Sequence, residues 1–268
     1  MIIQIEDDFD LQKIIDSGQC FRPVFCQNLN KYRFIYRKEV LYIQKISGNR
    51  YEVSCDTEKW NNIWKKYFDI DRNYNSIRQM IIGDSYLNKA ALFSEGIRIL
   101  RQDEWEMLIS FIISQRKSIP AIRSSIEKLC TNFGEMICTE YEKVYLFPKP
   151  EALLKADENM LAQCGLGYRL LYVVDAARSV ALGNLICDEL HDLDDDNLFD
   201  ALCELKGVGT KVANCVMLFG YGRTGRAPVD VWIKKVIDEQ YGGVNPFEIY
   251  GDYAGIVQQF LFYYRRNE

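Results

Sequence analysis

The sequence predicts an α+β protein, with an N-terminal domain carrying an antiparallel β-sheet, residues 1–98, and an all-α domain, residues 99–268. Residues 32–55 are rich in Tyr, Ile and Val and are broken by the turn-like stretches RKE and SGNR, which is typical of an antiparallel meander. The N-terminal stretch IIQIED can add a strand. After Trp60 the apolar residues recur at helical spacing to the end of the chain.

The helical part carries clear start and stop signals. Asp103 and Glu106 form a capping box before an apolar stripe, and Pro120 lies early in a helix that Gly134 closes. Asp230 is placed to cap the helix VWIKKVIDEQYGG. The remaining helices are expected before CGLGYR, over residues 168–182, through LFDALCEL and over residues 252–264.

Composition limits the classes of function. With 268 residues and 48% hydrophobic content the chain can bury a sizeable core, and no apolar run approaches the ~20 residues that a membrane helix needs. The N-terminus has no basic segment before an apolar one. We therefore expect a cytoplasmic monomer that does not interact with membranes.

The cysteine and histidine content limits which metal sites and catalytic nucleophiles the protein can have. The nine cysteines include no CxxC pair and fit reduced thiols. His191 is the single histidine, which excludes a zinc site built on histidines and disfavours a Ser/His or Cys/His nucleophile pair. We expect no metal and no cofactor, and chemistry that depends on lysine and carboxylate.

The net charge of −5 does not decide whether the partner is a nucleic acid. Nucleic-acid-binding domains are usually basic, but seven of the 38 acidic residues lie between Asp188 and Asp200. A basic face elsewhere is compatible with that concentration of acid.

The stretch LCELKGVGTKVANCVMLF, residues 202–219, indicates a tight helix-hairpin-helix. Gly207 and Gly209 permit positive φ and close backbone approach, and Thr210 can cap the second helix. The exposed amides and the positive end of that helix suit an anion such as a DNA phosphate. The KGVG stretch alone fits an ordinary helix corner equally well.

Lys211 lies in the first turn of the second helix. The helix dipole and partial burial both disfavour its charged form, and a neutral amine is a nucleophile. Cys215, four residues on, shares its face. A lysine at a helix start is otherwise most often a solvated surface residue. The carboxylate of Asp230 can cap its helix and also stabilise positive charge developing on a sugar ring.

Four segments together resemble a known family. LKGVGTKVANC, followed 19 residues after its lysine by the aspartate of PVDV, resembles the helix-hairpin-helix DNA glycosylases and, among them, the 8-oxoguanine DNA glycosylase/lyases. SGQCFR, LGYR and YAGIVQQFLF, at residues 17–22, 166–169 and 253–262, resemble other stretches of that family in the same order. The compact length is similar to the bacterial branch.

The resemblance implies a helix-hairpin-helix glycosylase domain and a covalent mechanism. Lys211 would attack C1′ of the damaged nucleotide, displace the base and leave a Schiff base that permits β-elimination of the strand. Asp230 would be its carboxylate partner. The substrate would be double-stranded DNA containing 8-oxoguanine, with the base turned out of the duplex.

The resemblance also implies a base pocket. The Gly18 carbonyl would accept the N7 hydrogen that 8-oxoguanine has and guanine lacks. Cys215 and Phe262 would sandwich the base, and Gln258 would meet its Watson–Crick edge. The spacing of 258 and 262 places both side chains on one helical face. Without the resemblance, core packing would be the preferred reading of Phe262 and Cys215.

Further positions concern the DNA around the lesion. Gly207 and Gly209 would bind the backbone, while Tyr168 and Arg169 would form the wedge and the contact to the base left behind. Where the family has an asparagine and, five positions on, an arginine that read this base, the chain has Arg116 and Ala121. We therefore expect relaxed opposite-base selectivity, with Arg116 making a different contact.

The chain differs from the family pattern at one further position and lacks the cysteines of a related class of glycosylases. Trp232 stands where many members of the family have a histidine, so the resemblance implies that a phosphate contact is lost or replaced by stacking. No cysteine follows Cys215, which disfavours an iron-sulfur glycosylase of the endonuclease III type. A non-catalytic helix-hairpin-helix DNA-binding protein is the alternative. That alternative gives no reason for Lys211, Asp230 and Gly18 to occur together.

Overall fold

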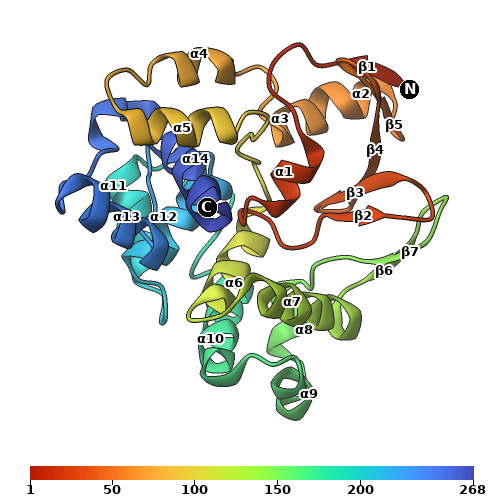
Figure 1. Ribbon diagram of the computed structural model, residues 1–268. Coiled ribbons are helices and arrows are strands. Elements are labelled where there is room, and N and C mark those ends of the chain that lie inside the picture. Colours follow the sequence, from red (N-terminus) through yellow and green to blue (C-terminus); the bar gives the residue numbers. More distant parts are fainter. The chain divides into compact units, whose positions relative to one another are not determined.

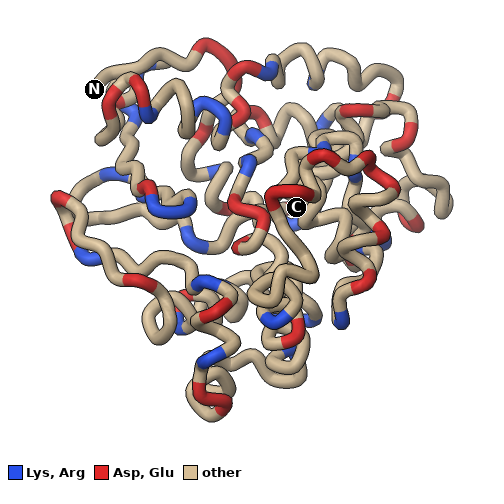
Figure 2. The backbone as a smooth tube through the Cα atoms, turned by 180° about the vertical axis from the view of Figure 1, so that it is seen from behind, with Lys and Arg blue, Asp and Glu red and all other residues tan.

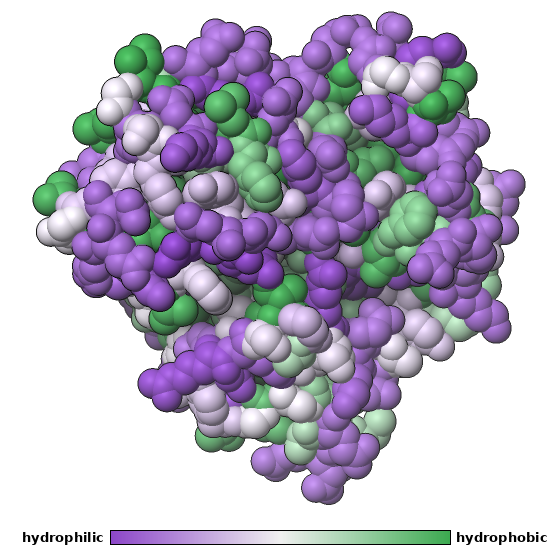
Figure 3. All heavy atoms as spheres, viewed as in Figure 1, coloured by the Kyte–Doolittle hydropathy of each residue, from purple (hydrophilic) through white to green (hydrophobic).

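The computed structural model describes residues 1–268 and divides into two compact units. Unit 1 consists of Met1–Phe34, Leu41–Arg101 and Gly222–Glu268, and unit 2 of Ile35–Val40 and Gln102–Tyr221. Each unit is therefore assembled from separate chain segments. No helix is long and apolar enough to cross a membrane, and hydrophobic side chains on the face drawn in Figure 3 are dispersed among hydrophilic ones.

An antiparallel sheet in the order β1-β5-β4-β3-β2 confirms the predicted meander (Figure 1). Its strands are β1 (Ile2–Gln4), β2 (Val24–Cys26), β3 (Lys31–Tyr36), β4 (Glu39–Ser47) and β5 (Arg50–Val53). The predicted breaks lie at the turns of the β3–β4 and β4–β5 hairpins, where Arg37 and Gly48 have φ of 53° and 52°. Strand β2 was not predicted.

The helices of unit 1 come from an N-terminal and a C-terminal part of the chain. In the N-terminal part these helices are α1 (Leu11–Asp16), α2 (Thr57–Lys59), η1 (Trp60–Trp64), α3 (Lys65–Tyr67), α4 (Tyr74–Gln79) and α5 (Ser85–Phe93). The C-terminal segment adds α13 (Val231–Tyr241), η4 (Glu248–Tyr253) and α14 (Ala254–Asn267). Helix α14 is buried from Ala254 to Leu261 and packs against α5 and α13.

Arg98 is the polar centre of unit 1. Its side chain is fully buried, and its guanidinium donates hydrogen bonds to the carbonyls of Phe68 at 3.0 Å, Asp8 at 2.8 Å and Asp69 at 2.6 Å. The same group lies 4.3 Å from the centroid of the Tyr74 ring. A buried charge is tolerated only when it is satisfied in this way, so Arg98 fixes the loops around it.

Unit 2 is built around α6 (Glu104–Ser114), a helix whose residues 104–113 are all buried. It packs against α7 (Ile119–Phe133), α10 (Leu170–Ala181) and α12 (Thr210–Phe219). The other helices are α8 (Pro150–Leu154), α9 (Glu158–Gln163), η2 (Gly167–Arg169), η3 (Glu189–Asp192) and α11 (Asp195–Cys203).

Local capping signals set these helix starts as expected. The Asp103 carboxylate accepts a hydrogen bond from the Glu106 amide at 2.8 Å, and Pro120 lies in the first turn of α7. A two-stranded sheet of β6 (Met136–Cys138) and β7 (Lys143–Tyr145) was not predicted. Its three-residue strands are too short to show an alternating pattern.

Candidate active site

The predicted hairpin is present between α11 and α12, which pack against each other. Gly207 has φ of 82°, and a Cβ there would lie 2.4 Å from ring atoms of Tyr172. The prediction that Thr210 caps the second helix was wrong, because Gly209 is the N-cap and Thr210 is the first helical residue. No side chain caps this helix. Its first amides are thus left for an external acceptor, which is the usual basis of an anion site.

Gln115, at the end of α6, holds the hairpin in place. Its side-chain amide donates to the Gly207 carbonyl at 2.9 Å and to the Ile112 carbonyl at 3.0 Å. The sequence analysis missed this residue because the two segments that it joins are 92 positions apart.

Lys211 is half-buried in the first turn of α12. Its amine donates to the Ser114 hydroxyl at 3.4 Å and lies 5.1 Å from the centroid of the Phe111 ring. Ser114 donates its own hydroxyl hydrogen to the Phe111 carbonyl at 2.7 Å, so its lone pairs are free to face the amine. Cys215, one turn further along α12, is 3% exposed. Ser114 and Phe111 are therefore neighbours of the predicted nucleophile that the sequence analysis did not identify.

Asp230 is the N-cap of α13, as predicted. Its Oδ1 accepts hydrogen bonds from the amides of Trp232 at 3.0 Å and Ile233 at 2.9 Å, which leaves Oδ2 outside the cap. Val231 and Trp232 beside it are 80% and 46% exposed. Asp230 thus presents one carboxylate oxygen beside exposed apolar side chains.

Gly18 lies in a rigid turn of unit 1, with φ of 82°. The Gln259 side chain donates to the Ser17 carbonyl at 2.6 Å, which ties this turn to α14. The Gln19 side chain donates to the Ser17 hydroxyl at 2.8 Å and accepts from the Leu100 amide at 2.7 Å. Unit 1 therefore brings Gly18 next to the helix that carries the two predicted base contacts.

Gln258 is buried, at 4% exposed, yet its Oε1 has no hydrogen-bond partner in the protein. An unsatisfied buried acceptor costs about 1–3 kcal/mol, so such a group commonly serves a ligand. Phe262, one turn on, is half-buried, with the Arg266 guanidinium 5.4 Å from its ring centroid.

Tyr168 and Arg169 differ sharply in exposure. The Tyr168 side chain is 51% exposed, whereas Arg169 is 7% exposed and its guanidinium lies 4.4 Å from the Tyr168 ring centroid. Arg116 is exposed and has φ of 50°, an unusual value for a residue other than glycine.

Both signs of charge are found throughout the chain (Figure 2), so its basic residues are not confined to one segment.

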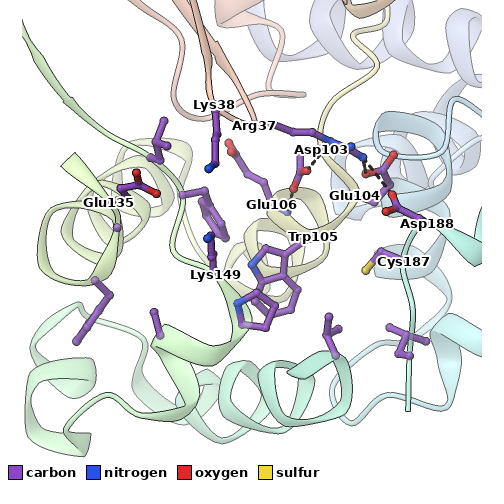
Figure 4. A pocket seen from close by; sticks show the side chains of 18 of the residues that line it. Arg37, Lys38, Asp103, Glu104, Trp105, Glu106, Glu135, Lys149, Cys187 and Asp188 are labelled. Atoms are coloured by element: carbon purple, nitrogen blue, oxygen red, sulfur yellow. Dashed lines mark hydrogen bonds and ion pairs between the residues drawn. The ribbon is translucent and has the colours of Figure 1, made fainter. Parts of the chain in front are cut away.

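A separate cavity of about 680 Å³ lies within unit 2 and is lined by none of the predicted site residues (Figure 4). On one wall Arg37 pairs with Asp103 at 3.3 Å, Glu104 at 3.1 Å and Asp188 at 3.2 Å. Burial and the neighbouring acids raise the pKa of the Cys187 thiol to about 12, so it is not a nucleophile at neutral pH. The cavity gathers distant chain segments, which no local motif could predict.

Two protein-family models match consecutive parts of the chain. A family model described as the N-terminal domain of 8-oxoguanine DNA glycosylase matches residues 1–108. A second, described as HhH-GPD superfamily base excision DNA repair protein, matches residues 109–246.

Individual relatives are similar over most of the chain. The N-glycosylase/DNA lyase of Saccharomyces cerevisiae is 30% identical over 260 residues, covering 86% of this chain and 68% of that protein. The probable N-glycosylase/DNA lyase of Methanothermobacter thermautotrophicus is 30% identical, with coverages of 97% and 94%. The structure of Clostridium acetobutylicum 8-oxoguanine glycosylase/lyase, in complex with dsDNA containing cytosine opposite 8-oxoG, superposes with a TM-score of 0.90 at 34% identity, with coverages of 100% and 98%.

The fold and the hairpin thus define a base-excision DNA repair protein of the helix-hairpin-helix superfamily. Within that class the chain belongs to the 8-oxoguanine DNA glycosylase/lyase family and is an N-glycosylase/DNA lyase. Membership of a family of enzymes argues against the non-catalytic DNA-binding alternative.

The hairpin glycines provide a matched pair of variants. Gly207→Ala should lower the free energy of unfolding by about 1–3 kcal/mol, because its Cβ overlaps Tyr172 and its φ is positive. Gly209→Ala should change it by less than about 0.5 kcal/mol, because its φ is −105° and nothing lies within 4 Å of an added Cβ. Urea unfolding measures both. Equal losses in the two variants would contradict the packing described here.

Proposed function

We propose that this enzyme removes 8-oxoguanine from double-stranded DNA with Lys211 as the nucleophile and Asp230 as its carboxylate partner, and that it acts as a monomer. The observation that carries the proposal is the half-buried Lys211 amine, held between Ser114 and Phe111 in the first turn of the uncapped hairpin helix. That position combines a nucleophile with a phosphate-binding terminus.

The chemical steps follow from the two functional groups. After losing a proton, the Lys211 amine attacks C1′, and the glycosidic bond breaks with its electron pair leaving on the base, which takes up a proton. The C1′–O4′ bond then breaks, O4′ takes up a proton, and the nitrogen lone pair forms the C1′=N bond of a protonated Schiff base. Loss of a C2′ proton then breaks the C3′–O bond, which is the β-elimination step. The free Oδ2 of Asp230 is suited to stabilise the positive charge that develops on the sugar.

Phe111 and Ser114 support this chemistry at the amine. The face of an aromatic ring stabilises a nearby cation, and the Schiff base is cationic. The Ser114 hydroxyl, whose hydrogen is committed to the Phe111 carbonyl, can only accept from the amine and therefore orients it. The Phe111 ring thus stabilises charge and the Ser114 hydroxyl positions the amine, and neither transfers a proton.

Recognition of the everted base would use Gly18, Cys215, Gln258 and Phe262. The Gly18 carbonyl would accept the N7 hydrogen of 8-oxoguanine, and the unpaired Oε1 of Gln258 would accept from the Watson–Crick edge. Phe262 and Cys215 would contact the two faces of the ring. Binding the lesion would satisfy a buried acceptor that the free protein leaves unpaired.

The DNA around the lesion would be held by the hairpin and by the wedge. The amides at Gly207 and Gly209 would bind backbone phosphate, and the half-exposed Tyr168 would fill the vacated stack. The exposed Trp232 would stack against DNA where relatives use a histidine. Ala121 has no side chain that could hydrogen-bond an opposite base, which supports relaxed opposite-base selectivity.

Borohydride trapping tests the nucleophile. With a duplex containing 8-oxoguanine, the wild-type protein should become covalently attached to DNA, and Lys211→Gln should abolish the adduct while retaining DNA binding. Lys155→Gln, which removes an exposed lysine of unit 2, is the control and should trap normally. An undiminished adduct in Lys211→Gln would assign the Schiff base to another amine.

Single-turnover excision opposite each of the four bases tests the selectivity. We expect the four rates to lie within about tenfold, which corresponds to about 1.4 kcal/mol. Ala121→Arg should restrict excision to fewer partners by adding a donor at that position. Strict dependence of the wild-type enzyme on cytosine would refute relaxed selectivity.

A further inference from the structure

We propose that the cavity in unit 2 is a second ligand site, which binds a small organic cation with a flat apolar body. The cationic group of this ligand would pair with the carboxylates of Glu106 and Glu135. Its body would lie against the aromatic side chains of Trp105, Phe133 and Phe147. None of the residues to which we assign catalysis or base recognition lines the cavity, so this site is separate from the proposed active site.

The cavity has the size and the rigid wall that a small molecule needs. Its volume of about 680 Å³ lies within the range of about 300–1,000 Å³ that is usual for ligand pockets. Trp105, in the first turn of α6, is 9% exposed, and its indole Nε1 donates a hydrogen bond to the Pro148 carbonyl at 2.9 Å. Because this hydrogen bond fixes the indole, the ring is a flat wall that is already in place before a ligand binds.

Negative charge is in excess on the wall of the cavity. Five carboxylates and three cations line it, which gives a net charge of −2. Arg37 already pairs with three of the carboxylates, at 3.1 to 3.3 Å. The lining carboxylates are Asp103, Glu104, Glu106, Glu135 and Asp188, and the cations are Arg37, Lys38 and Lys149.

Burial shows which of these charges are fixed. Glu104 and Glu106 are only 5% and 8% exposed. Lys38 and Lys149 are exposed, and their side chains make no hydrogen bond or ion pair within the protein. A long exposed lysine can turn its amine into water, whereas a buried carboxylate cannot leave the wall. The fixed charge of the cavity is therefore negative, which favours a cation over an anion.

The Cys187 thiol, which also lines the cavity, responds to this charge. Burial has the largest effect on it, and the carboxylates of Asp103 and Glu104 add to that effect, so that its pKa is raised to about 12. A negative potential disfavours the thiolate in the same way that it favours a cationic ligand.

The side of the cavity away from Arg37 provides the contacts for the cation. Figure 4 shows Glu106 and Glu135 on that side, whereas Asp103, Glu104 and Asp188 gather at the Arg37 guanidinium. The Glu135 carboxylate is exposed and has no partner in the protein. An amidinium or ammonium group pairs with carboxylates, and the face of an indole stabilises a nearby cation. Both kinds of contact are present in this part of the cavity.

A titration with three probes of the same shape tests the sign of the ligand charge. The probes are benzamidine, benzamide and benzoate, which are cationic, neutral and anionic at pH 7.5. In protein labelled with ¹⁵N-tryptophan, the assigned indole N–H signal of Trp105 should shift saturably with benzamidine, with a dissociation constant of about 1 mM. Benzoate should bind at least about tenfold more weakly, and benzamide should lie between the two. The signals of the other three tryptophans should not move.

Variants on the wall test the assigned contacts. Glu135→Gln should weaken benzamidine binding about threefold, and Lys38→Gln should tighten it by a similar factor, because each changes one exposed charge near the cation. Glu140→Gln, which removes an exposed carboxylate of unit 2 outside the cavity, is the control and should leave the affinity unchanged.

Three results would overturn the inference: no saturable shift at Trp105, benzoate or benzamide binding as tightly as benzamidine, or equal affinity of Glu135→Gln and the wild-type protein for benzamidine. Because the titration contains no DNA, its outcome does not depend on the chemistry proposed for Lys211.

Discussion

The contact between Gly207 and the Tyr172 ring is the constraint on which the proposed catalytic surface depends. The hairpin backbone lies so close to the ring that a Cβ at position 207 would be 2.4 Å from its atoms. In this position the Gly207 carbonyl accepts a hydrogen bond from the Gln115 side-chain amide, and α12 begins three residues later, at Thr210. Lys211 is the second residue of that helix, four positions after Gly207, so its location follows from a glycine that does no chemistry.

Polar side chains that hydrogen-bond within the protein lie around the residues to which we assign catalytic or binding roles. In unit 1, Gln19 and Gln259 hold the Gly18 turn, while Arg98 binds the loops beside it. In unit 2, Gln115 and Arg169 hold the hairpin and the wedge. The Oε1 of Gln258 is unpaired, whereas the side chain of its neighbour Gln259 donates to the Ser17 carbonyl. A rigid, satisfied frame around a few unsatisfied groups is the arrangement that preorganised binding sites require.

The parts of this structure that the sequence predicted well are those encoded locally. The caps at Asp103 and Asp230, and the proline in the first turn of α7, depend on residues within one turn of helix, and all three were predicted. The assignment of the α12 cap to Thr210 failed because the extended backbone that an N-cap needs falls at Gly209. Strand β2 and the β6–β7 pair were missed because three residues carry too little pattern.

Contacts between residues far apart in the chain could not be predicted from the sequence, for a different reason. The Ser114 hydroxyl meets the Lys211 amine from 97 positions away, and the Gln115 carbonyl meets Arg169 from 54 positions away. No periodicity or motif relates residues at such separations; only the packing of α6 against α10 and α12 does. The motifs located the segments of the site, whereas the structure identified the residues that position them.

A crystal structure of the Lys211→Gln protein bound to a duplex containing 8-oxoguanine tests the central claim most directly. Our account predicts an everted base with N7 about 3 Å from the Gly18 carbonyl, its Watson–Crick edge on Gln258, and C1′ facing position 211. A base that stays stacked in the duplex, or that enters the cavity beside Arg37 and Trp105, would contradict it.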